Sequence, residues 1–220
     1  EHLEVQNMFK EAKSEVPLKV KDLPASVDLR PWCSPVEDQG KLGSCTSHAV
    51  ISLVEYLQKR AQGEYLDASR RFLYKVTRKL YGLTGDTGAY IRGTIKALRI
   101  FGVCPEQYWI YDIQNFDEEP GAFCYAFAQA YKALVYYRLD TANTKTSITL
   151  DRIKAQLAVG LSVAFGFTVY SSIYDPSVKK TGNIPYPKKG DKVVGGHAIA
   201  GIAYDDKAKV IKIRNSWGTA

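Results

Sequence analysis

The sequence predicts an α+β fold in two lobes, because a helical first half is followed by a strand-rich second half. In the first half, apolar residues recur three and four positions apart, which is the spacing of one helix face. In the second half, short apolar and β-branched runs lie between turn residues, which is typical of strands. The 220 residues, 45% of them hydrophobic, can bury one large core or two modest ones.

The first 22 residues are predicted to form an arm, and residues 23–220 a folded domain. The arm is rich in Lys and Glu, and Pro17 and Pro24 bracket an extended connection to the domain. A short helix is marginal alone and needs a surface on which to dock. Such a helix is expected within the arm, because four apolar residues share one helix face: Val5, Met8, Phe9 and Ala12.

Three helices are predicted in the first half of the domain. The first opens at Gly43 and Ser44, where Ser44 is a suitable N-cap. The second covers Ser69 to about Leu80. The third covers about Tyr90 to Phe101 and stops at Gly102.

The second half is predicted to contain four strands and one helix. The last two strands form a pair that is joined by the turn residues Asp205 and Asp206. The helix is expected over about Leu150 to Val159, and the strands over Val135 to Leu139, Leu161 to Val169, His197 to Ala203, and Val210 to Arg214.

The charge and the cysteines bear on the class of protein. The net charge of +7 does not favour nucleic-acid binding, because the basic residues are spread along the chain. No apolar run approaches the ~18 residues of a membrane span. The cysteines form no CxxC pair and no cluster with histidine, so neither a metal nor a cofactor is expected. They are Cys33, Cys45, Cys104 and Cys124.

One segment places Cys45 in the first turn of a predicted helix. It reads Asp38-Gln39-Gly40-Lys41-Leu42-Gly43-Ser44-Cys45. The positive end of the helix dipole favours a thiolate there, and the thiolate is the nucleophilic form of cysteine. Gln39 offers a side-chain amide to a developing oxyanion, beside the backbone N–H of Cys45. Taken alone, the segment fits an ordinary buried thiol equally well, since free cysteines are usually core residues.

Two histidines compete for the role of the base. His197 follows two glycines at the head of an apolar strand, where its ring can face a cleft, although most single histidines are satisfied core residues. His48 lies three residues after Cys45 on the same helix. Its ring would have to reach back past the first helical turn, so we expect His48 to be a packing residue.

A third segment supplies a group that can orient the base. It reads Arg214-Asn215-Ser216-Trp217-Gly218 and follows the last predicted strand. The Asn215 amide can accept the second ring N–H of a histidine, and Trp217 can shield that hydrogen bond from water. The competing interpretation is a turn with an exposed indole.

Together the three segments resemble the papain family of cysteine peptidases. That family has a cysteine-centred motif with histidine and asparagine ~130–150 residues downstream. Here His197 and Asn215 lie slightly further downstream of Cys45, as insertions in surface loops would explain. The resemblance begins at Leu23-Pro24-Ala25-Ser26-Val27-Asp28-Leu29-Arg30 and includes Gly102-Val103-Cys104-Pro105-Glu106.

The resemblance implies a papain-like fold, with a helical left lobe over about 33–137. A β-barrel-like right lobe would comprise about 23–32 and 138–220, with the active-site cleft between the lobes. It implies Cys45 as nucleophile, His197 as base, Asn215 as the orienting residue and Gln39 in the oxyanion hole. A resting thiolate–imidazolium pair would need a lowered thiol pKa and a raised imidazole pKa. The expected substrate-binding residues are Gly43, Ser44, Gly88, Tyr90, Gly195, Ala198 and Trp217.

The implied activity is that of a cysteine endopeptidase that cleaves peptide or protein substrates through a thioester acyl-enzyme. The implied molecule is a monomer that needs no cofactor. Its N-terminal arm would lie along the cleft as an intramolecular inhibitor, or else be a disordered end or pack elsewhere on the right lobe. At most one disulfide can form if Cys45 is catalytic. The cysteines therefore do not decide whether the protein is secreted, periplasmic or intracellular.

Several departures from the family pattern point to a divergent, bacterial-type branch with few disulfides. Thr46 stands where the family usually has an aromatic residue, and Leu42 where it usually has a disulfide cysteine. The partner cysteine is also missing near Gly85 to Gly88. The sequence ends before the hairpin that usually follows Asn-Ser-Trp-Gly. These departures leave open a papain-fold protein that binds peptides or another ligand without cleaving them.

Overall fold

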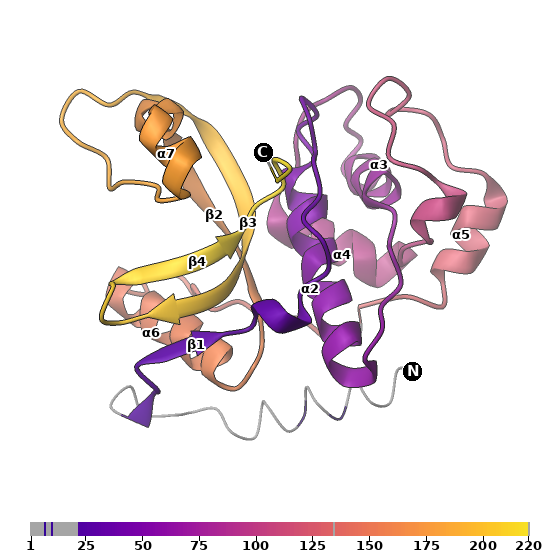
Figure 1. The fold of residues 1–220 in the computed structure, drawn as a ribbon. Helices are drawn as coiled ribbons and strands as arrows, with labels where there is room; N and C mark the ends of the chain where they lie inside the picture. Colours follow the sequence, from indigo (N-terminus) through magenta and orange to yellow (C-terminus); the bar gives the residue numbers. More distant parts are fainter. Residues whose placement is uncertain (1–6, 8–9, 11–21, 134, 220) are drawn as a thin grey trace.

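The computed structural model describes residues 22–133 and 135–219, together with Asn7 and Lys10. It has two lobes, one helical and one built on a β-sheet (Figure 1). This architecture confirms the predicted α+β fold. The helix expected in the N-terminal arm falls outside the described residues.

The helical lobe contains all three helices that the sequence predicts. They are α2 (Cys45–Gln62), α3 (Arg70–Leu80) and α4 (Ile91–Phe101). The Ser69 hydroxyl accepts the Phe72 N–H at 3.1 Å, and this side-chain cap starts α3. A fourth helix, α5 (Ala122–Ala128), and a 3₁₀ turn, η3 (Glu106–Tyr108), were not predicted.

The core of the helical lobe is a single cluster around α3. Phe72, Leu73 and Val76 are fully buried there, and Val50 and Leu98 of the neighbouring helices pack with them. Each such side chain contributes roughly 1.5–3 kcal/mol to folding through burial. Gly102 ends α4 with a φ of 76°, and a Cβ there would lie 1.8 Å from the Ala128 carbonyl oxygen. Only glycine therefore lets α5 pack directly against the end of α4.

The sheet of the other lobe has β3 (Val193–Asp205) as its central strand. The strands β2 (Val163–Tyr170) and β1 (Ser26–Asp28) run antiparallel to successive parts of β3 along one edge. The strand β4 (Val210–Arg214) is antiparallel to β3 along the other edge. A closed barrel needs two neighbours for every strand. In the described residues β1, β2 and β4 each pair with β3 alone, so the sheet is open rather than barrel-like.

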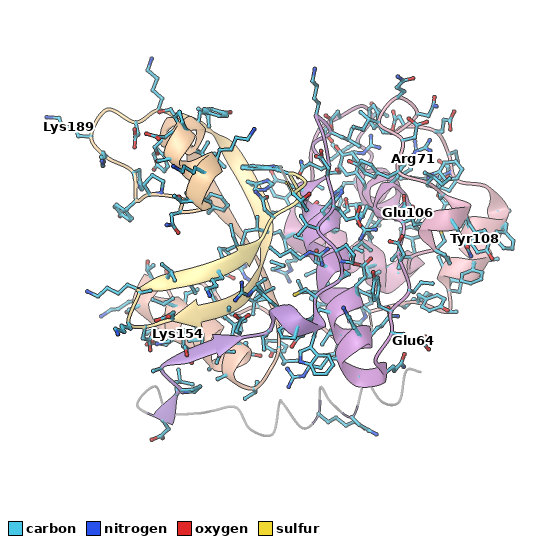
Figure 2. All side chains as sticks on the ribbon, in the orientation of Figure 1. Glu64, Arg71, Glu106, Tyr108, Lys154 and Lys189 are labelled. Carbon is cyan, nitrogen blue, oxygen red and sulfur yellow. The ribbon has the colours of Figure 1, made fainter. Side chains whose placement is uncertain are left out.

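Two helices and two 3₁₀ turns complete this lobe. They are η2 (Arg30–Trp32), α6 (Thr146–Ala158), η4 (Ser171–Tyr174) and α7 (Pro176–Thr181). The helix α6 starts four residues before its predicted beginning, and β3 starts four residues before His197. Figure 2 shows Lys154 and Lys189 far apart on this lobe, so these two basic side chains do not share a patch.

One predicted strand is wrong. Residues 135–139 form no strand in the structure, although their sequence is rich in β-branched and aromatic residues. Val135 is 59% exposed and Tyr137 is 46% exposed, so this run lies on the surface with no neighbouring strand among the described residues.

Both apolar and polar contacts join the two lobes. Tyr56 of α2 packs with Leu157 of α6 and Tyr204 of β3, and all three are buried. Behind this cluster, Arg214 donates to the Ser34 hydroxyl at 2.6 Å, and Ser34 donates to the buried Glu55 carboxylate at 2.5 Å. The helix that carries Cys45 is thus connected to the strand that precedes Asn215. In the described part of the chain, no helix is long and apolar enough to cross a membrane.

Candidate active site

Cys45 is the first residue of α2, at the face where the helix meets β3. Burial raises the pKa of its thiol above the usual 9.0. The backbone N–H groups of Ala198, Thr46 and Cys45 itself act in the opposite direction, because they lie near the sulfur and favour the thiolate. Since Ala198 directly follows His197, the contact brings the head of the helix and the predicted base together.

The side chain of His197 is held between an amide and an indole. Its Nε2 lies 2.7 Å from Asn215 Oδ1, and its ring stacks on Trp217 with 4.6 Å between centroids. The same Oδ1 accepts the Ser216 N–H at 2.9 Å, which identifies it as the acceptor. His197 therefore carries its proton on Nε2 and leaves Nδ1 free to take another. Phe167 meets the ring edge-on at 6.0 Å.

The pKa directions in the free protein do not support the expected resting thiolate–imidazolium pair, which stays a prediction. Burial lowers the pKa of His197 below 6.5, with only a partial opposing effect from Asn215. The pKa of Cys45 is raised, as described above. Both directions favour the uncharged forms, because both groups are largely removed from water.

Gln39 is buried and is bound by both lobes. Its Oε1 accepts the Ser216 hydroxyl at 2.6 Å, and its backbone N–H donates to the Ser216 carbonyl at 2.8 Å. Its Nε2 donates one proton to the Leu42 carbonyl at 2.9 Å. An amide nitrogen has two protons, and no described residue accepts the second. The geometry thus leaves one side-chain donor of Gln39 for a bound group.

The expected substrate-binding residues differ in exposure. Tyr90 is 84% exposed and Trp217 is 43% exposed. Gly195 is exposed, Gly43 and Gly88 are partly exposed, and Ala198 is buried.

The Ser44 side chain has a different role from the N-cap that was expected of it. It is fully buried, so a contact of Ser44 with a substrate would fall to its backbone. It also makes no side-chain cap for α2. Its hydroxyl instead lies 2.6 Å from the Tyr111 hydroxyl and 3.3 Å from His48 Nδ1. Ser44 therefore supports the loop before Cys45 from inside.

His48 is a packing residue, as its position in the helix predicted. Its ring meets Tyr111 edge-on at 5.0 Å, and its Nδ1 lies 3.1 Å from the Ser44 carbonyl. Burial lowers the pKa of His48 to about 4, so the ring is neutral at pH 7.

Three residues that the sequence reasoning did not assign to the site hold its loops in place. Tyr111 donates to the Gln39 carbonyl at 3.0 Å, and Asp86 and Tyr74 bind the loops that contain Gly43 and Gly88. These contacts join positions dozens of residues apart, and no local motif marks them. The four cysteines of the described chain are free thiols. No group of three or more His, Cys, Asp or Glu in that part could hold a metal.

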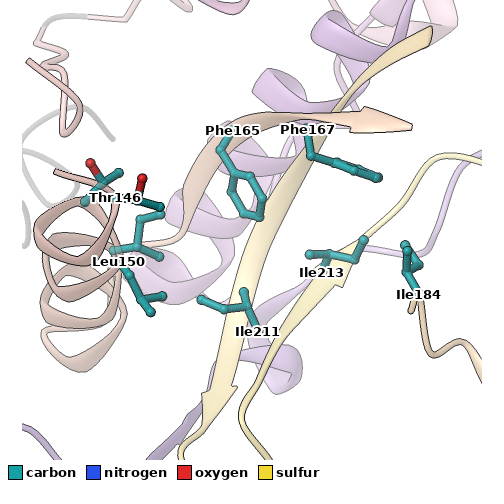
Figure 3. Close-up of a pocket in the computed structure, with 9 residues that line it drawn as sticks. Thr146, Leu150, Phe165, Phe167, Ile184, Ile211 and Ile213 are labelled. Atoms are coloured by element: carbon teal, nitrogen blue, oxygen red, sulfur yellow. The ribbon is translucent and has the colours of Figure 1, made fainter. Parts of the chain in front are cut away.

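An apolar groove of about 420 Å³ lies on the sheet lobe, between α6 and the strands β2 and β4 (Figure 3). Its walls include Phe165, Phe167, Ile211 and Ile213. The ring of Phe167 also meets the ring of His197 edge-on.

Comparisons with known proteins agree with this geometry. The model of the papain family of cysteine proteases matches residues 23–220. An uncharacterized peptidase C1-like protein of Acanthamoeba polyphaga mimivirus is 35% identical over 185 residues. That match covers 83% of this chain, and the chain spans 60% of the length of the viral relative.

Two solved structures extend the similarity to the fold. Xylellain, a cysteine protease from Xylella fastidiosa, is 36% identical with a TM-score of 0.76, covering 90% of this chain and 76% of that one. The ragweed pollen allergen Amb a 11, a cysteine protease in its proform, is 17% identical and shares the fold with a TM-score of 0.63. That match covers 93% of this chain and 59% of the ragweed chain. The chain therefore belongs to the papain family of cysteine proteases.

Proposed function

We propose that residues 23–220 form the peptidase domain of a cysteine endopeptidase that uses Cys45, His197 and Asn215. One observation carries the proposal. His197 is fixed on one side by Asn215 at 2.7 Å, while the backbone N–H of the next residue along β3 lies near the Cys45 thiol and favours its thiolate. A nucleophile, a base and a group that orients the base thus follow one another, as acyl transfer requires.

The reaction starts from an uncharged pair. His197 Nδ1 takes the thiol proton as Cys45 Sγ forms a bond to the carbonyl carbon of the peptide. The resulting oxyanion is stabilised by the free Nε2 proton of Gln39 and by the Cys45 N–H. His197 then gives its proton to the leaving amine, and the C–N bond breaks to leave a thioester. Water, deprotonated by His197, hydrolyses the thioester and releases Cys45.

Asn215 and Trp217 act on His197 rather than on the substrate in this scheme. The amide oxygen of Asn215 keeps the ring in the tautomer with its proton on Nε2, and it stabilises the imidazolium that forms after proton transfer. Trp217 covers one face of the ring and limits the access of water to this hydrogen bond.

Substrates of the proposed enzyme are extended peptides that lie across the junction of the lobes. Gly43 and Gly88 line the helical side, with Tyr90 nearby in sequence and highly exposed. Gly195, Ala198 and Trp217 line the sheet side. The Gly88 N–H already donates to Tyr74 and its carbonyl accepts the Thr87 hydroxyl at 3.1 Å, so the second lone pair of that carbonyl is what remains for a peptide.

We propose further that residues 1–22 restrain the enzyme by lying along the cleft. The apolar stripe Val5, Met8, Phe9 and Ala12 needs a surface, and one of the similar structures, the ragweed protease, is of a proform. Deletion of residues 1–22 should raise kcat/KM for a small fluorogenic peptide. An unchanged value, with the intact protein already fully active, would contradict this role.

The experiment that tests the main proposal is mass spectrometry after treatment of the folded protein with an epoxide inhibitor of thiol peptidases. We expect one adduct per molecule, located at Cys45, with Cys33, Cys104 and Cys124 unmodified. The matched control is His197→Ala, which keeps the thiol but lacks the base, and which should label far more slowly. Absence of labelling at Cys45 in the folded protein would instead indicate a binding protein without activity.

A further inference from the structure

One carboxylate bridges the two loops on the helical side of the site. Asp86 is exposed, and its Oδ1 and Oδ2 lie 2.9 and 3.1 Å from the Gly43 backbone nitrogen, whose N–H they accept. Gly43 comes two residues before Cys45, and Gly88 comes two residues after Asp86. The carboxylate therefore connects the loop before Cys45 to the loop of Gly88 on the same side of the site.

A buried hydroxyl completes the bridge. Tyr74 of α3 donates to Asp86 Oδ1 at 2.5 Å, and the same hydroxyl accepts the Gly88 N–H at 3.0 Å. The ring of Tyr74 is fully buried, and the Arg78 guanidinium lies 4.2 Å from its centroid. The hydroxyl is thus held from the core while it faces the two loops.

The two glycine loops meet so closely that small displacements matter. A Cβ at Gly43 would lie 2.9 Å from Asp86 Oδ1 and 3.3 Å from the Gly88 nitrogen. Gly88 has a φ of 69°, a conformation that L side chains rarely adopt. No disulfide joins these loops, because the described cysteines are free thiols. The contacts of Asp86 and Tyr74 are the hydrogen bonds that connect Gly43 with Gly88 in the described structure.

We propose that Asp86 and Tyr74 form a clamp that positions the Gly43 and Gly88 loops for peptide binding. Both are positioning residues, since they act through the loop backbone and not on the reacting atoms. The inference rests on the proposed peptidase function, because it assigns the clamp to the substrate side of that site. When the clamp is released, the wall loses its fixed spacing, and a peptide must then order the loop when it binds.

The primary test is the steady-state kinetics of Asp86→Ala with a fluorogenic peptide. We expect KM to rise about ten-fold while kcat stays within about two-fold, because a ground-state positioning contact is lost and the chemistry is retained. Tyr74→Phe should act in the same direction. The double variant should show less than the sum of the two effects, because both residues act through one contact. Asp86→Asn should recover part of the affinity, since its amide oxygen can still accept the Gly43 N–H.

The matched control is Asp175→Ala on the other lobe. Asp175 is likewise exposed, and it accepts the Ser177 N–H at 2.8 Å at the start of α7. We expect its KM to equal that of the wild type. A KM for Asp86→Ala within two-fold of the wild type would overturn the clamp, and so would strictly additive effects of the two substitutions.

Amide hydrogen exchange separates failure of the clamp from failure of the peptidase proposal. In Asp86→Ala, peptides that cover residues 82–90 should exchange about ten-fold faster than in the wild type, and those that cover α7 should not change. This measurement needs no activity, so it stays decisive even if the wild type hydrolyses no peptide. An unchanged exchange rate over residues 82–90 would contradict the proposed clamp, whatever the kinetics show.

Discussion

The two lobes contribute to one site from supports that are packed very differently. The helical lobe surrounds α3 with other helices, so that Phe72 and its neighbours lose all contact with water. The sheet lobe packs against α2, while Phe165, Ile211 and Ile213 line an open groove together with residues of α6 (Figure 3). The proposed nucleophile thus starts from a closed core, and the proposed base stands on a sheet that also borders an accessible apolar groove. Substitutions of equal size should therefore have unequal costs in the two lobes.

The largest expected effects come from the two residues that meet across the lobes. Cys45→Ala and His197→Ala should each lower kcat/KM at least about 10³-fold, or roughly 4 kcal/mol of transition-state stabilisation. Asn215→Ala should cost less, about 10–100-fold, because it orients the base and does not transfer the proton. Cys45→Ala should keep its free energy of unfolding within about 1 kcal/mol of the wild type.

Kinetics with a fluorogenic peptide and urea unfolding would check these values. Loss of the fold in Cys45→Ala would favour a purely structural thiol. Equal kinetic losses in Asn215→Ala and His197→Ala would contradict the role given to Asn215.

One Phe→Ala substitution in each lobe would measure the difference in packing between the two lobes. Phe72→Ala should lower the free energy of unfolding by about 3–5 kcal/mol, because the fully buried ring leaves a cavity. Phe165→Ala should cost about 1–2 kcal/mol, because the ring borders the groove and is only partly buried. Both can be read from urea unfolding curves with unchanged m-values. Equal losses would mean that the groove is closed in solution.

An acid in the helical lobe should make the stability of that lobe depend on pH. Burial raises the pKa of Glu106 from 4.5 to about 7, and no described residue bonds its Oε2 (Figure 2). The folded form therefore binds the proton more tightly than the unfolded form. The contribution of this proton to the free energy of unfolding is fully present below pH 4.5 and is lost as pH rises through about 7.

Glu106→Gln should remove this dependence, because the neutral amide can still accept the Tyr111 N–H. The unfolding free energy of the variant minus that of the wild type should therefore increase by about 2–3 kcal/mol as pH rises from 4.5 to 8. Urea unfolding at a series of pH values would measure the difference, from which the titration of His48 cancels. A difference that stays flat with pH would rule out the buried proton.

The smallest effect concerns the charge state at the junction of the lobes. The lowered pKa of His197 places the acid limb of kcat/KM below pH 6.5, and the raised pKa of Cys45 places the alkaline limb above pH 9.0. The ultraviolet absorbance of the thiolate, taken as the difference between wild type and Cys45→Ala, should appear only on the alkaline side. A thiolate signal already present at pH 6.5 would instead show that Cys45 and His197 form a resting ion pair.

The sequence was most informative where local chemistry decides structure. The helix at Ser69 has a side-chain cap, and α4 ends at a glycine that has a positive φ. The strand predicted over residues 135–139 failed because β-branched and aromatic composition alone does not supply a neighbouring strand. The helix α7 begins at Asp175-Pro176, where Asp175 caps the Ser177 N–H, a signal present in the sequence but not used. The short β1 strand exists only because β3 pairs with it.

The site divides in the same way. Cys45, His197 and Asn215 could be located because each stands in a short segment with its own chemical character. Asp86, Tyr74 and Tyr111 could not, because their partners lie 12 to 72 positions away in the chain. The charged pair was expected from the helix dipole, which is visible in a sequence, whereas the depth of burial that opposes it is not.

The hydrogen bonds between Gln39 and Ser216 set a condition on any motion of the lobes. Ser216 is the neighbour of Asn215, and Gln39 carries the proposed donor for the oxyanion. If the lobes part by the length of one hydrogen bond, both groups lose their orientation in the same event. In the proposed enzyme, a copy whose lobes have separated would therefore lose activity completely rather than in part.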